Sequence, residues 1–278
     1  MKDEDLLRYS RQIALPEIDI SGQSKISQSK VIVIGLGGLG TVVASYLCRM
    51  GIGEITVCDY DKIDISNLHR QILYNSNDLG SQKAKKTQDN LNLINPGIII
   101  KAIEKPLCKP SLDKLVTNQD VVVDATDNFK SRYLINEVCW KNKKTLVSGS
   151  AIGWKGQLLV LDFNKNSSPC YECLYGHEIK EDDSCSELGI IPPVAGVVGS
   201  LQALETIKLV LEEEGSFSYL TEFNGLTNDI RRILEYPIMM TPAPYKRVVP
   251  NNNLPLIFKL PDDANNEALI KAPMEEID

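Results

Sequence analysis

The sequence predicts an α/β fold, a Rossmann-like doubly wound mixed sheet with added antiparallel strands at its carboxyl end. Three features predict this class. Short apolar runs alternate with amphipathic segments along most of the chain, which is typical of strands and helices in α/β proteins. One of these runs enters a glycine-rich turn that opens a helix. Near the carboxyl end, Asn224-Gly225 separates two strand-like runs and is typical of a hairpin turn.

The glycine-rich turn lies between a buried strand predicted over residues 31–34 and a helix predicted over 41–50. Glycines allow the backbone to approach a phosphate closely, and the first N–H groups of a helix offer it hydrogen bonds. The turn therefore predicts a nucleotide-binding site. Its four glycines are Gly35, Gly37, Gly38 and Gly40.

The next predicted strand, 55–58, ends at Asp59, which lies 24 residues after Gly35 (59 − 35). An acidic residue at about this distance holds ribose hydroxyls in dinucleotide-binding folds. Asp61 follows two residues later and is an alternative for the same role. A dense polar cluster comes next, in a place where catalytic groups are expected. It contains Asn67, His69, Arg70 and Gln71.

A helix is predicted after this cluster, with Ser81 as its N-cap and Asn95-Pro96-Gly97 as its end. Lys83 lies in the first turn of this helix. A cation there opposes the helix dipole, which favours anions at the N-terminus. The placement is therefore unfavourable unless Lys83 has an anionic partner.

The alternation continues towards the middle of the chain. Asp124 and Asp127 fall at the carboxyl end of the strand predicted over 121–123, where open α/β sheets bind ligands. The strand over 157–163 is expected to be antiparallel. The remaining predictions are a strand over 98–103, helices over 111–115 and 129–142, and a strand over 145–147.

The last elements are a long helix over 194–213 and a closing hairpin with strands over 219–223 and 230–234. One face of the long helix is predicted to face the core, with Val198, Leu201, Leu204 and Ile207.

The domain organisation predicted from these elements is simple. Residues 1–30 form an N-terminal arm whose first helix ends before Pro16. Residues 31–240 form a single nucleotide-binding domain. Residues 241–278 are rich in proline and asparagine and are predicted to be a mobile tail.

The composition excludes several classes of protein. The chain has 278 residues and a net charge of −7, which argues against binding to nucleic acid. The charged N-terminus lacks the apolar core of a signal peptide, and no apolar run of about 18 residues suggests a membrane span. The seven scattered cysteines suit reduced thiols in the cytoplasm. We therefore expect a cytoplasmic protein without a nucleic-acid or membrane partner.

Seven motifs together resemble the ThiF/MoeB/HesA family. In chain order they are RYSRQI, GLGGLG, DYDKIDISNLHRQ, GSQK, DATDN, a CxxC pair and GVVGSLQALETIK. The resemblance covers roughly residues 5–236. Members of this family resemble ubiquitin-activating enzymes and are usually homodimers. The resemblance implies that ATP adenylates the C-terminal carboxylate of a small ubiquitin-fold sulfur carrier and that pyrophosphate is released.

The resemblance also implies roles for individual residues. The glycine turn cradles the nucleotide, and either Asp59 or Asp61 takes the ribose hydroxyls. Asp127 holds Mg²⁺, and Arg11 reaches the triphosphate of the partner subunit. Cys185 matches a position where some relatives have a thiol that links covalently to the carrier. The residues implied to contact the phosphates are Asn67, Arg70, Gln71 and Lys83.

Many relatives hold a structural Zn²⁺ with two CxxC pairs, of which this chain has one. Cys170 and Cys173 form the pair that is present. The second pair is expected just after the closing hairpin, where residues 231–246 contain neither cysteine nor histidine. A closed structural zinc site needs four ligands, so we predict that no zinc binds tightly.

Three alternatives are open at this point. The same chemistry can act on a short ribosomal peptide or another carboxylate. The glycine turn can also serve a nicotinamide- or flavin-dependent oxidoreductase, which leaves Arg70, Gln71, Lys83 and Asp127 without a role. A non-catalytic partner of an activating enzyme is the third, and the full set of polar residues argues against it.

Overall fold

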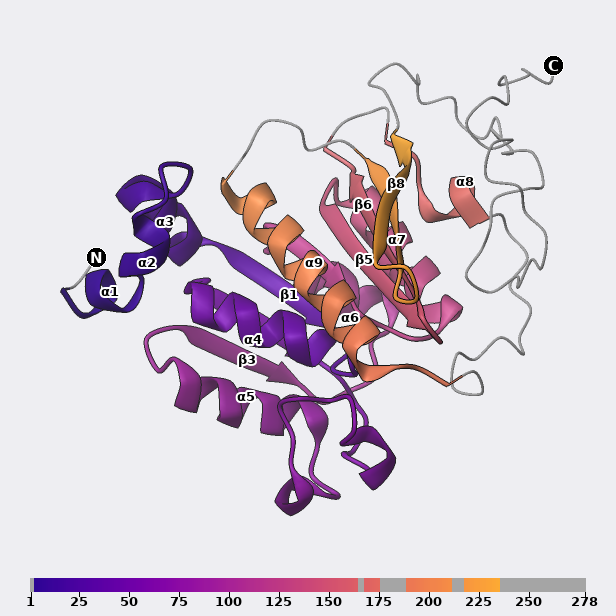
Figure 1. Ribbon diagram of the computed structural model, residues 1–278, viewed down its shortest axis with the longest axis horizontal. Helices are drawn as coiled ribbons and strands as arrows, with labels where there is room; N and C mark the ends of the chain where they lie inside the picture. Colours follow the sequence, from indigo (N-terminus) through magenta and orange to yellow (C-terminus); the bar gives the residue numbers. More distant parts are fainter. Residues whose placement is uncertain (1–2, 165–167, 176–188, 212–217, 236–278) are drawn as a thin grey trace.

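The structure is a computed structural model that describes residues 3–164, 168–175, 189–211 and 218–235. A single eight-stranded sheet runs through it in the order β3-β2-β1-β4-β5-β6-β7-β8 (Figure 1). Neighbouring strands are parallel from β3 to β5 and antiparallel from β5 to β8. The predicted fold class is therefore confirmed. The strands are β1 Lys30–Ile34, β2 Glu54–Cys58, β3 Ile99–Ile103, β4 Val121–Asp124, β5 Thr145–Ile152, β6 Lys155–Asp162, β7 Tyr219–Asn224 and β8 Asp229–Glu235.

Helices cover both faces of this sheet. Apolar residues of α3, α4, α5 and α9 form one cluster with one face, and those of α6, α7 and α8 form a second cluster with the other. The helices are α1 Asp3–Arg8, α2 Ser10–Ile13, α3 Asp19–Gln28, α4 Gly40–Met50, α5 Lys83–Ile94, α6 Lys109–Thr117, α7 Phe129–Lys141, α8 Tyr171–Tyr175 and α9 Pro192–Leu211, with 3-10 turns η1 Ile65–Asn67 and η2 Ser76–Asp78.

Strand β1 shows how the two layers arise from the sequence. Val31 and Val33 join the cluster under α4, whereas Ile32 and Ile34 join the cluster under α6 and α7. All four side chains are buried because successive residues of a strand point to opposite faces. Each such side chain contributes about 1.5–3 kcal/mol when fully buried.

The connections after β1 and β4 create a topological switch point at the carboxyl end of these strands, the region called the crevice below. After β1 the chain enters α4 on one face, and after the adjacent β4 it enters α7 on the opposite face. Adjacent strands whose connections leave on opposite faces define a switch point, which is where open α/β sheets bind ligands. The two connecting loops touch, since a Cβ on Gly35 would lie 2.7 Å from the carbonyl oxygen of Ala125.

The long helix α9 differs from its prediction in one respect. Leu204 was predicted to face the core but is 54% exposed, whereas Gln202 is fully buried. The buried face runs through Val194, Val198, Gln202 and Thr206 because residues four apart share a face. Among the described helices, α9 has the length and apolar composition of a membrane span, but over half of that stretch is buried within the fold.

Smaller differences concern the ends of elements. Strand β5 continues to Ile152, five residues beyond its prediction. The N-cap of α5 is Gln82 rather than Ser81, and its side chain makes no capping hydrogen bond. The region predicted as an arm contains α3, whose Ile26 is fully buried in the core. The predicted tail 241–278 lies outside the described residues, and the domain division stays a prediction.

Candidate functional site

The glycine turn has the close backbone packing that its sequence predicts. Gly35 has φ +88°, a backbone conformation that residues with a Cβ atom rarely adopt. A Cβ on Gly40 would lie 1.9 Å from the carbonyl oxygen of Gly35, so only glycine fits there. The turn leads directly into α4, whose first N–H groups face the crevice end of the sheet. This arrangement can bind a phosphate group.

Asp59 connects the end of β2 to the glycine turn. Its Oδ2 accepts a hydrogen bond from the backbone N–H of Leu36 (2.7 Å), and its Oδ1 accepts one from Asp61 (2.8 Å). Burial raises the pKa of the Asp59 carboxyl, although Lys83 and the two N–H groups act in the opposite direction. The carboxylate is therefore fixed beside the turn, as a ribose-binding group would need to be.

Lys83 has the anionic partner that its position at the start of α5 requires. Its Nζ lies 3.1 Å from Oδ2 of Asp61, and its side chain is 8% exposed while that of Asp61 is 54% exposed. An ion pair so open on one side contributes about 1 kcal/mol or less to stability. A buried lysine directed at the crevice is thus better explained by ligand binding than by stability.

The polar segment after β2 folds over the glycine turn. A Cβ on Gly38 would lie 3.3 Å from Cγ of Arg70. A Cβ on Gly37 would lie 4.0 Å from Nε2 of Gln71. Arg70 donates from Nη1 to the carbonyl oxygen of Ser66 (3.0 Å). Two of the predicted phosphate-binding residues, Arg70 and Gln71, therefore lie beside the turn.

Gln71 and Asn67 differ in what their side chains do. Gln71 is 1% exposed, and its Oε1 has no hydrogen-bond partner among the described residues. Such a buried unpaired acceptor calls for an explanation, and a bound ligand or water supplies one. Asn67 instead caps the turn η1, because its Oδ1 accepts from the backbone N–H of Asp64 at 3.3 Å and Asp64 caps the turn in return.

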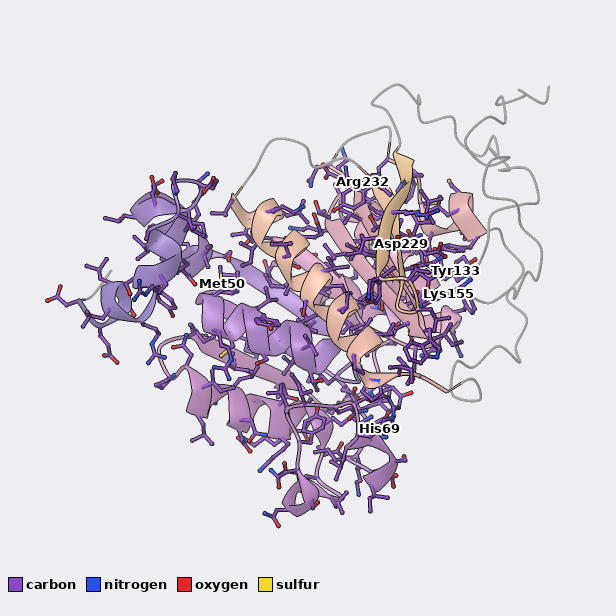
Figure 2. All side chains as sticks on the ribbon, in the orientation of Figure 1. Met50, His69, Tyr133, Lys155, Asp229 and Arg232 are labelled. Atoms are coloured by element: carbon purple, nitrogen blue, oxygen red, sulfur yellow. The ribbon has the colours of Figure 1, made fainter. Side chains whose placement is uncertain are left out.

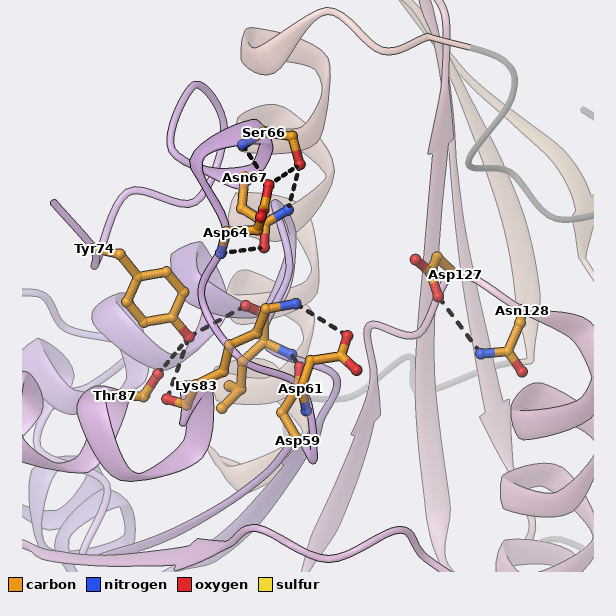
Figure 3. Close-up of polar contacts among 11 residues, drawn as sticks. Asp59, Asp61, Asp64, Ser66, Asn67, Tyr74, Lys83, Thr87, Asp127 and Asn128 are labelled. Carbon is orange, nitrogen blue, oxygen red and sulfur yellow. Dashed lines mark hydrogen bonds and ion pairs between the residues drawn. The ribbon is translucent and has the colours of Figure 1, made fainter. Parts of the chain in front are cut away.

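Asp127 lies on the loop after β4, across the crevice from Asp59 and Asp61 (Figure 3). Its side chain is exposed and is contacted by Nδ2 of Asn128 at 3.5 Å. The pKa of Tyr60 is raised by Asp61, by burial, and further by Asp59 and Asp127. All three carboxylates therefore act electrostatically on Tyr60, but no three acidic, histidine or cysteine side chains of the described residues are grouped to hold a metal ion.

Arg11 does not join this site within its own chain. It is exposed on α2, and the adjacent Gln12 donates from Nε2 to the carbonyl oxygen of Met50 (2.9 Å). Met50 ends α4, whereas the glycine turn begins it. The 11 residues of α4 separate the two ends by about 16 Å. Figure 2 shows Met50 and His69, which belongs to the polar segment, far apart on the molecule.

The CxxC pair lies at the start of α8, away from the crevice. The Sγ atoms of Cys170 and Cys173 are 3.3 Å apart. The hydrogen bond from Cys170 lowers the pKa of Cys173 to about 6, and this bond and burial raise the pKa of Cys170. The described residues supply no third histidine, cysteine or carboxylate to this pair, so they do not fit a closed zinc site. Cys185 lies outside the described residues.

Sequence reasoning missed Gln202, a fully buried residue of α9 that contacts the end of β4. Its amide Nε2 donates to the carbonyl oxygen of Asp124 (2.8 Å), directly before the Asp127 loop. The signal that identifies it is its spacing of four residues from both Val198 and Thr206, which places it on the buried face of α9.

The fold and this geometry define an α/β nucleotide-binding protein. A glycine turn, a fixed ribose-type carboxylate, two cationic side chains and an exposed aspartate meet at the ends of β1, β2 and β4. This donor set suits a nucleoside triphosphate.

The comparison with protein families specifies the class further. The chain belongs to the ThiF family, whose model matches residues 9–238. It is 40% identical over 233 residues to the sulfur carrier protein ThiS adenylyltransferase of Escherichia coli K12, and the match covers 84% of this chain and 92% of that protein. It is 39% identical over 210 residues to the molybdopterin-synthase adenylyltransferase of the same organism, with 76% and 84% covered.

Other relatives are longer than this chain. The adenylyltransferase and sulfurtransferase MOCS3 of Anopheles gambiae is 41% identical over 236 residues, which are 84% of this chain and 53% of that protein. The chain thus spans about half the length of the MOCS3 relatives that it matches.

Solved structures have the same fold. Escherichia coli MccB, crystallised with AMPCPP and MccA, is 25% identical, with a TM-score of 0.70 and 81% of this chain and 70% of that chain covered. PaaA is 18% identical, with a TM-score of 0.71 and 85% and 75% covered, and this likeness shows the fold alone.

Proposed function

We propose that this protein uses ATP to adenylate the C-terminal carboxylate of a small ubiquitin-fold sulfur-carrier protein. The observation that carries the proposal is the meeting of the glycine turn, the Asp61–Lys83 pair, Arg70 and Asp127 at one end of the sheet. The names of the relatives at about 40% identity supply the acceptor, since one is an adenylyltransferase of the sulfur carrier ThiS.

The reaction requires two anions to meet. An oxygen of the carrier carboxylate forms a bond to the α-phosphorus of ATP, and the bond from this phosphorus to the bridging oxygen breaks to release pyrophosphate. The carboxylate is already ionised at neutral pH, so no general base is needed. The task of the protein is to offset negative charge, and Arg70 and Lys83 supply the cations.

The chain's own groups supply roles for the phosphates and the ribose of ATP. The N–H groups of the glycine turn and of α4 bind phosphate oxygens. Asp59, fixed beside Leu36, accepts hydrogen bonds from the ribose hydroxyls. The Oε1 of Gln71, which has no hydrogen-bond partner among the described residues, supports the binding of a polar ligand beside the turn. Asn67 acts through η1, by holding the polar segment in place.

Asp127 is the residue that would hold Mg²⁺. In nucleotide sites this ion is usually bound by one or two carboxylates together with phosphate oxygens and water, so one exposed aspartate suffices. When bound, the ion offsets charge on the phosphates as the α-phosphorus is attacked.

A homodimer in which Arg11 completes the site of the partner subunit is part of this proposal. The support from the structure is the distance of about 16 Å along α4 between the Arg11 end and the glycine turn of the same chain. An exposed arginine at that place is too far from the glycine turn to contact the nucleotide of its own chain. We further propose that the protein acts in the cytoplasm, on the basis of its scattered cysteines.

A short peptide is the second candidate acceptor. It is favoured by the likeness to MccB, whose structure was solved with AMPCPP and MccA. The carrier is preferred because identity is about 40% to the carrier adenylyltransferases and 25% to MccB. The oxidoreductase alternative gains no support from these relatives.

Carboxylate-dependent exchange of pyrophosphate into ATP tests the proposal. We expect exchange with a ubiquitin-fold carrier that ends in a free glycine carboxylate, and none with the same carrier ending in a carboxamide. Exchange with short peptides but not with the carrier would favour the peptide as the acceptor. Tight binding of NAD without any exchange would contradict both.

A further inference from the structure

A buried polar cluster lies beneath the loop that carries Asp127. Its members come from three separate elements: Asp124 ends β4, Ser148 lies in β5 and Gln202 lies in α9. Their exposed fractions are 1%, 2% and 0%. Burying polar groups costs free energy unless they are hydrogen-bonded, and apolar residues of the same size would pack here without that cost. The cluster therefore calls for a reason other than stability.

The Asp124 carboxylate is held from two sides. Its Oδ1 accepts from the backbone N–H (3.0 Å) and the hydroxyl (2.7 Å) of Thr126, and its Oδ2 accepts from the hydroxyl of Ser148 (2.7 Å). Two of these donors belong to the loop itself. The carboxylate thus fixes the loop two residues after the strand, immediately before Asp127.

Gln202 holds the base of the same loop. Its Nε2 donates to the carbonyl oxygens of Asp124 (2.8 Å) and Val147 (3.3 Å), the second of which lies in β5. Gly149 leaves room for this amide, because a Cβ there would lie 2.4 Å from Cδ of Gln202. The Oε1 of Gln202 finds no partner among the described residues, so its orientation is set by the donor side alone.

The far side of the loop is held as well. The Arg132 guanidinium, in α7, donates to the carbonyl oxygen of Thr126, and Asn128 caps α7 by accepting from the backbone N–H of Ser131 (2.9 Å). Between these fixed points lies Asp127, whose own carboxylate is exposed towards the crevice. The hydrogen bonds of the loop backbone to Asp124 and Arg132 therefore hold in place a residue whose own carboxylate is exposed.

We propose that Asp124, Ser148 and Gln202 are positioning residues that set the place of the Asp127 carboxylate opposite Asp61 and Lys83. This inference rests on the proposed function, in which Asp127 supports adenylation. The three residues touch neither nucleotide nor acceptor. They act through the backbone of residues 125–126.

The test combines substitutions in the cluster with Asp127→Ala. Gln202→Met keeps the volume and removes the donor, and Ser148→Ala removes one hydroxyl with little change in packing. Each is expected to lower pyrophosphate exchange about 10-fold, since a small misplacement of a reacting group has effects of this order or larger. In an Asp127→Ala background the same substitutions should cause no further loss, because their effect passes through Asp127.

A binding measurement gives a readout other than activity. A non-hydrolysable ATP analogue is titrated by calorimetry with Mg²⁺ and with EDTA. The cluster variants should reduce the gain in affinity that Mg²⁺ gives and leave the affinity in EDTA unchanged. Thr145→Val is the matched control: Thr145 is also buried in β5 and donates its hydroxyl to a carboxylate, Oδ1 of Asp162 (3.2 Å), at the opposite end of the strand from the crevice. It should lower stability without changing either readout.

The outcomes separate this inference from the proposed function. If Asp127→Ala retains full exchange, the role of Asp127 in the proposed function is wrong, and the positioning role falls with it. If Asp127→Ala loses exchange while folded Gln202→Met and Ser148→Ala keep it, the proposed function stands and the positioning role is wrong. Additive losses in the double variants would show a merely structural role. Should Gln202→Met fail to fold, Ser148→Ala decides by the same criteria.

Discussion

The parallel and antiparallel parts of the sheet differ in what their strands carry at their ends. In the parallel part, β1, β2 and β4 each end in residues that face one crevice: the glycine turn, Asp59 with Asp61, and the Asp127 loop. In the antiparallel part, a hairpin joins β7 to β8, and the connection from β6 to β7 contains α8 and α9. The reactive feature of this part is the Cys170–Cys173 pair beside α8. Parallel strands bring residues that are distant in sequence to the same end of the sheet. Antiparallel strands joined by hairpins place their carboxyl ends alternately at opposite ends of the sheet.

The comparison implies a division of roles. The proposed nucleotide chemistry depends on the parallel part, because Asp59, Asp61, Arg70, Lys83 and Asp127 lie at its end. The antiparallel part extends the sheet and covers the cluster that contains α8. Substitutions of equal severity in the two parts should therefore differ in their effect on adenylation.

The largest expected effect follows removal of charge at the crevice. Asp127→Ala or Arg70→Ala should lower pyrophosphate exchange by at least about 10²-fold, the usual cost of a lost contact to transition-state charge. Both proteins should fold, since neither side chain packs in the core. Asp113→Ala, which removes a carboxylate on α6 that pairs with Lys141 instead, is the matched control and should exchange normally. Near-normal exchange in folded Asp127→Ala would refute the metal-binding role.

The second effect is the recovery of activity on mixing two inactive proteins. If Arg11 acts in the partner's site, a mixed dimer of Arg11→Ala and Asp127→Ala subunits contains one intact site. Exchange should then return to a substantial fraction of the normal rate once subunit exchange has been shown by native mass spectrometry. Mixed dimers without activity would show that Arg11 does not act across subunits.

Much of the parallel part could be predicted because its signals are local. The glycine spacing, the aspartate after the second strand and the aspartates after β4 each lie within a few residues of the strand that positions them. Since these strands are parallel, the residues that follow them meet at the carboxyl end of the sheet. The fold class and the order of elements were accessible in this way. The closeness of Arg70 and Gln71 to the turn was implied by the family resemblance instead.

The rest could not be predicted because it depends on contacts between distant segments. Gln202 reaches Asp124 from 78 residues away, and its polarity made the exposed Leu204 a more plausible core residue. The pairing of Lys83 with Asp61 required the loop between them to fold back. Asn67 has the residue type of a phosphate ligand, yet its side chain completes a local cap.

The third prediction concerns the antiparallel part and expects a small effect on adenylation. Cys170→Ser and Cys173→Ser should exchange pyrophosphate normally, because both thiols lie beside α8 rather than the crevice. Metal analysis of protein purified without chelators should find less than one zinc per chain. One zinc per chain, lost in Cys170→Ser, would show this prediction wrong.

The thiols themselves give a sharper readout of the same pair. With its pKa lowered to about 6, Cys173 should react with iodoacetamide at pH 7 before Cys48 and Cys58, whose pKa values burial raises to about 11 and about 12. Peptide mass spectrometry gives the order. Cys185→Ser should also leave adenylation intact, and only a downstream transfer of sulfur should depend on it.

The smallest expected effect is a dependence of nucleotide affinity on pH. Because burial raises the pKa of Asp59, this carboxyl takes up its proton at a higher pH than an exposed aspartate does. Protonation removes its ability to accept from both ribose hydroxyls, so affinity should fall as the pH falls through the mildly acidic range. Asp59→Asn should bind more weakly at neutral pH and lose this dependence. An unchanged pH profile in Asp59→Asn would assign the effect to another group.

Intact mass spectrometry of the acceptor tests the central claim most directly. The protein is incubated with ATP, Mg²⁺ and a ubiquitin-fold carrier that ends in a free glycine carboxylate, with pyrophosphatase present to prevent reversal. The carrier should gain the mass of one adenylyl group. The carboxamide form of the carrier should not, and Asp127→Ala should abolish the gain. A carrier that stays unmodified while a short peptide is adenylated, or adenylation that Asp127→Ala does not affect, would contradict the adenylation of a sulfur carrier at this site.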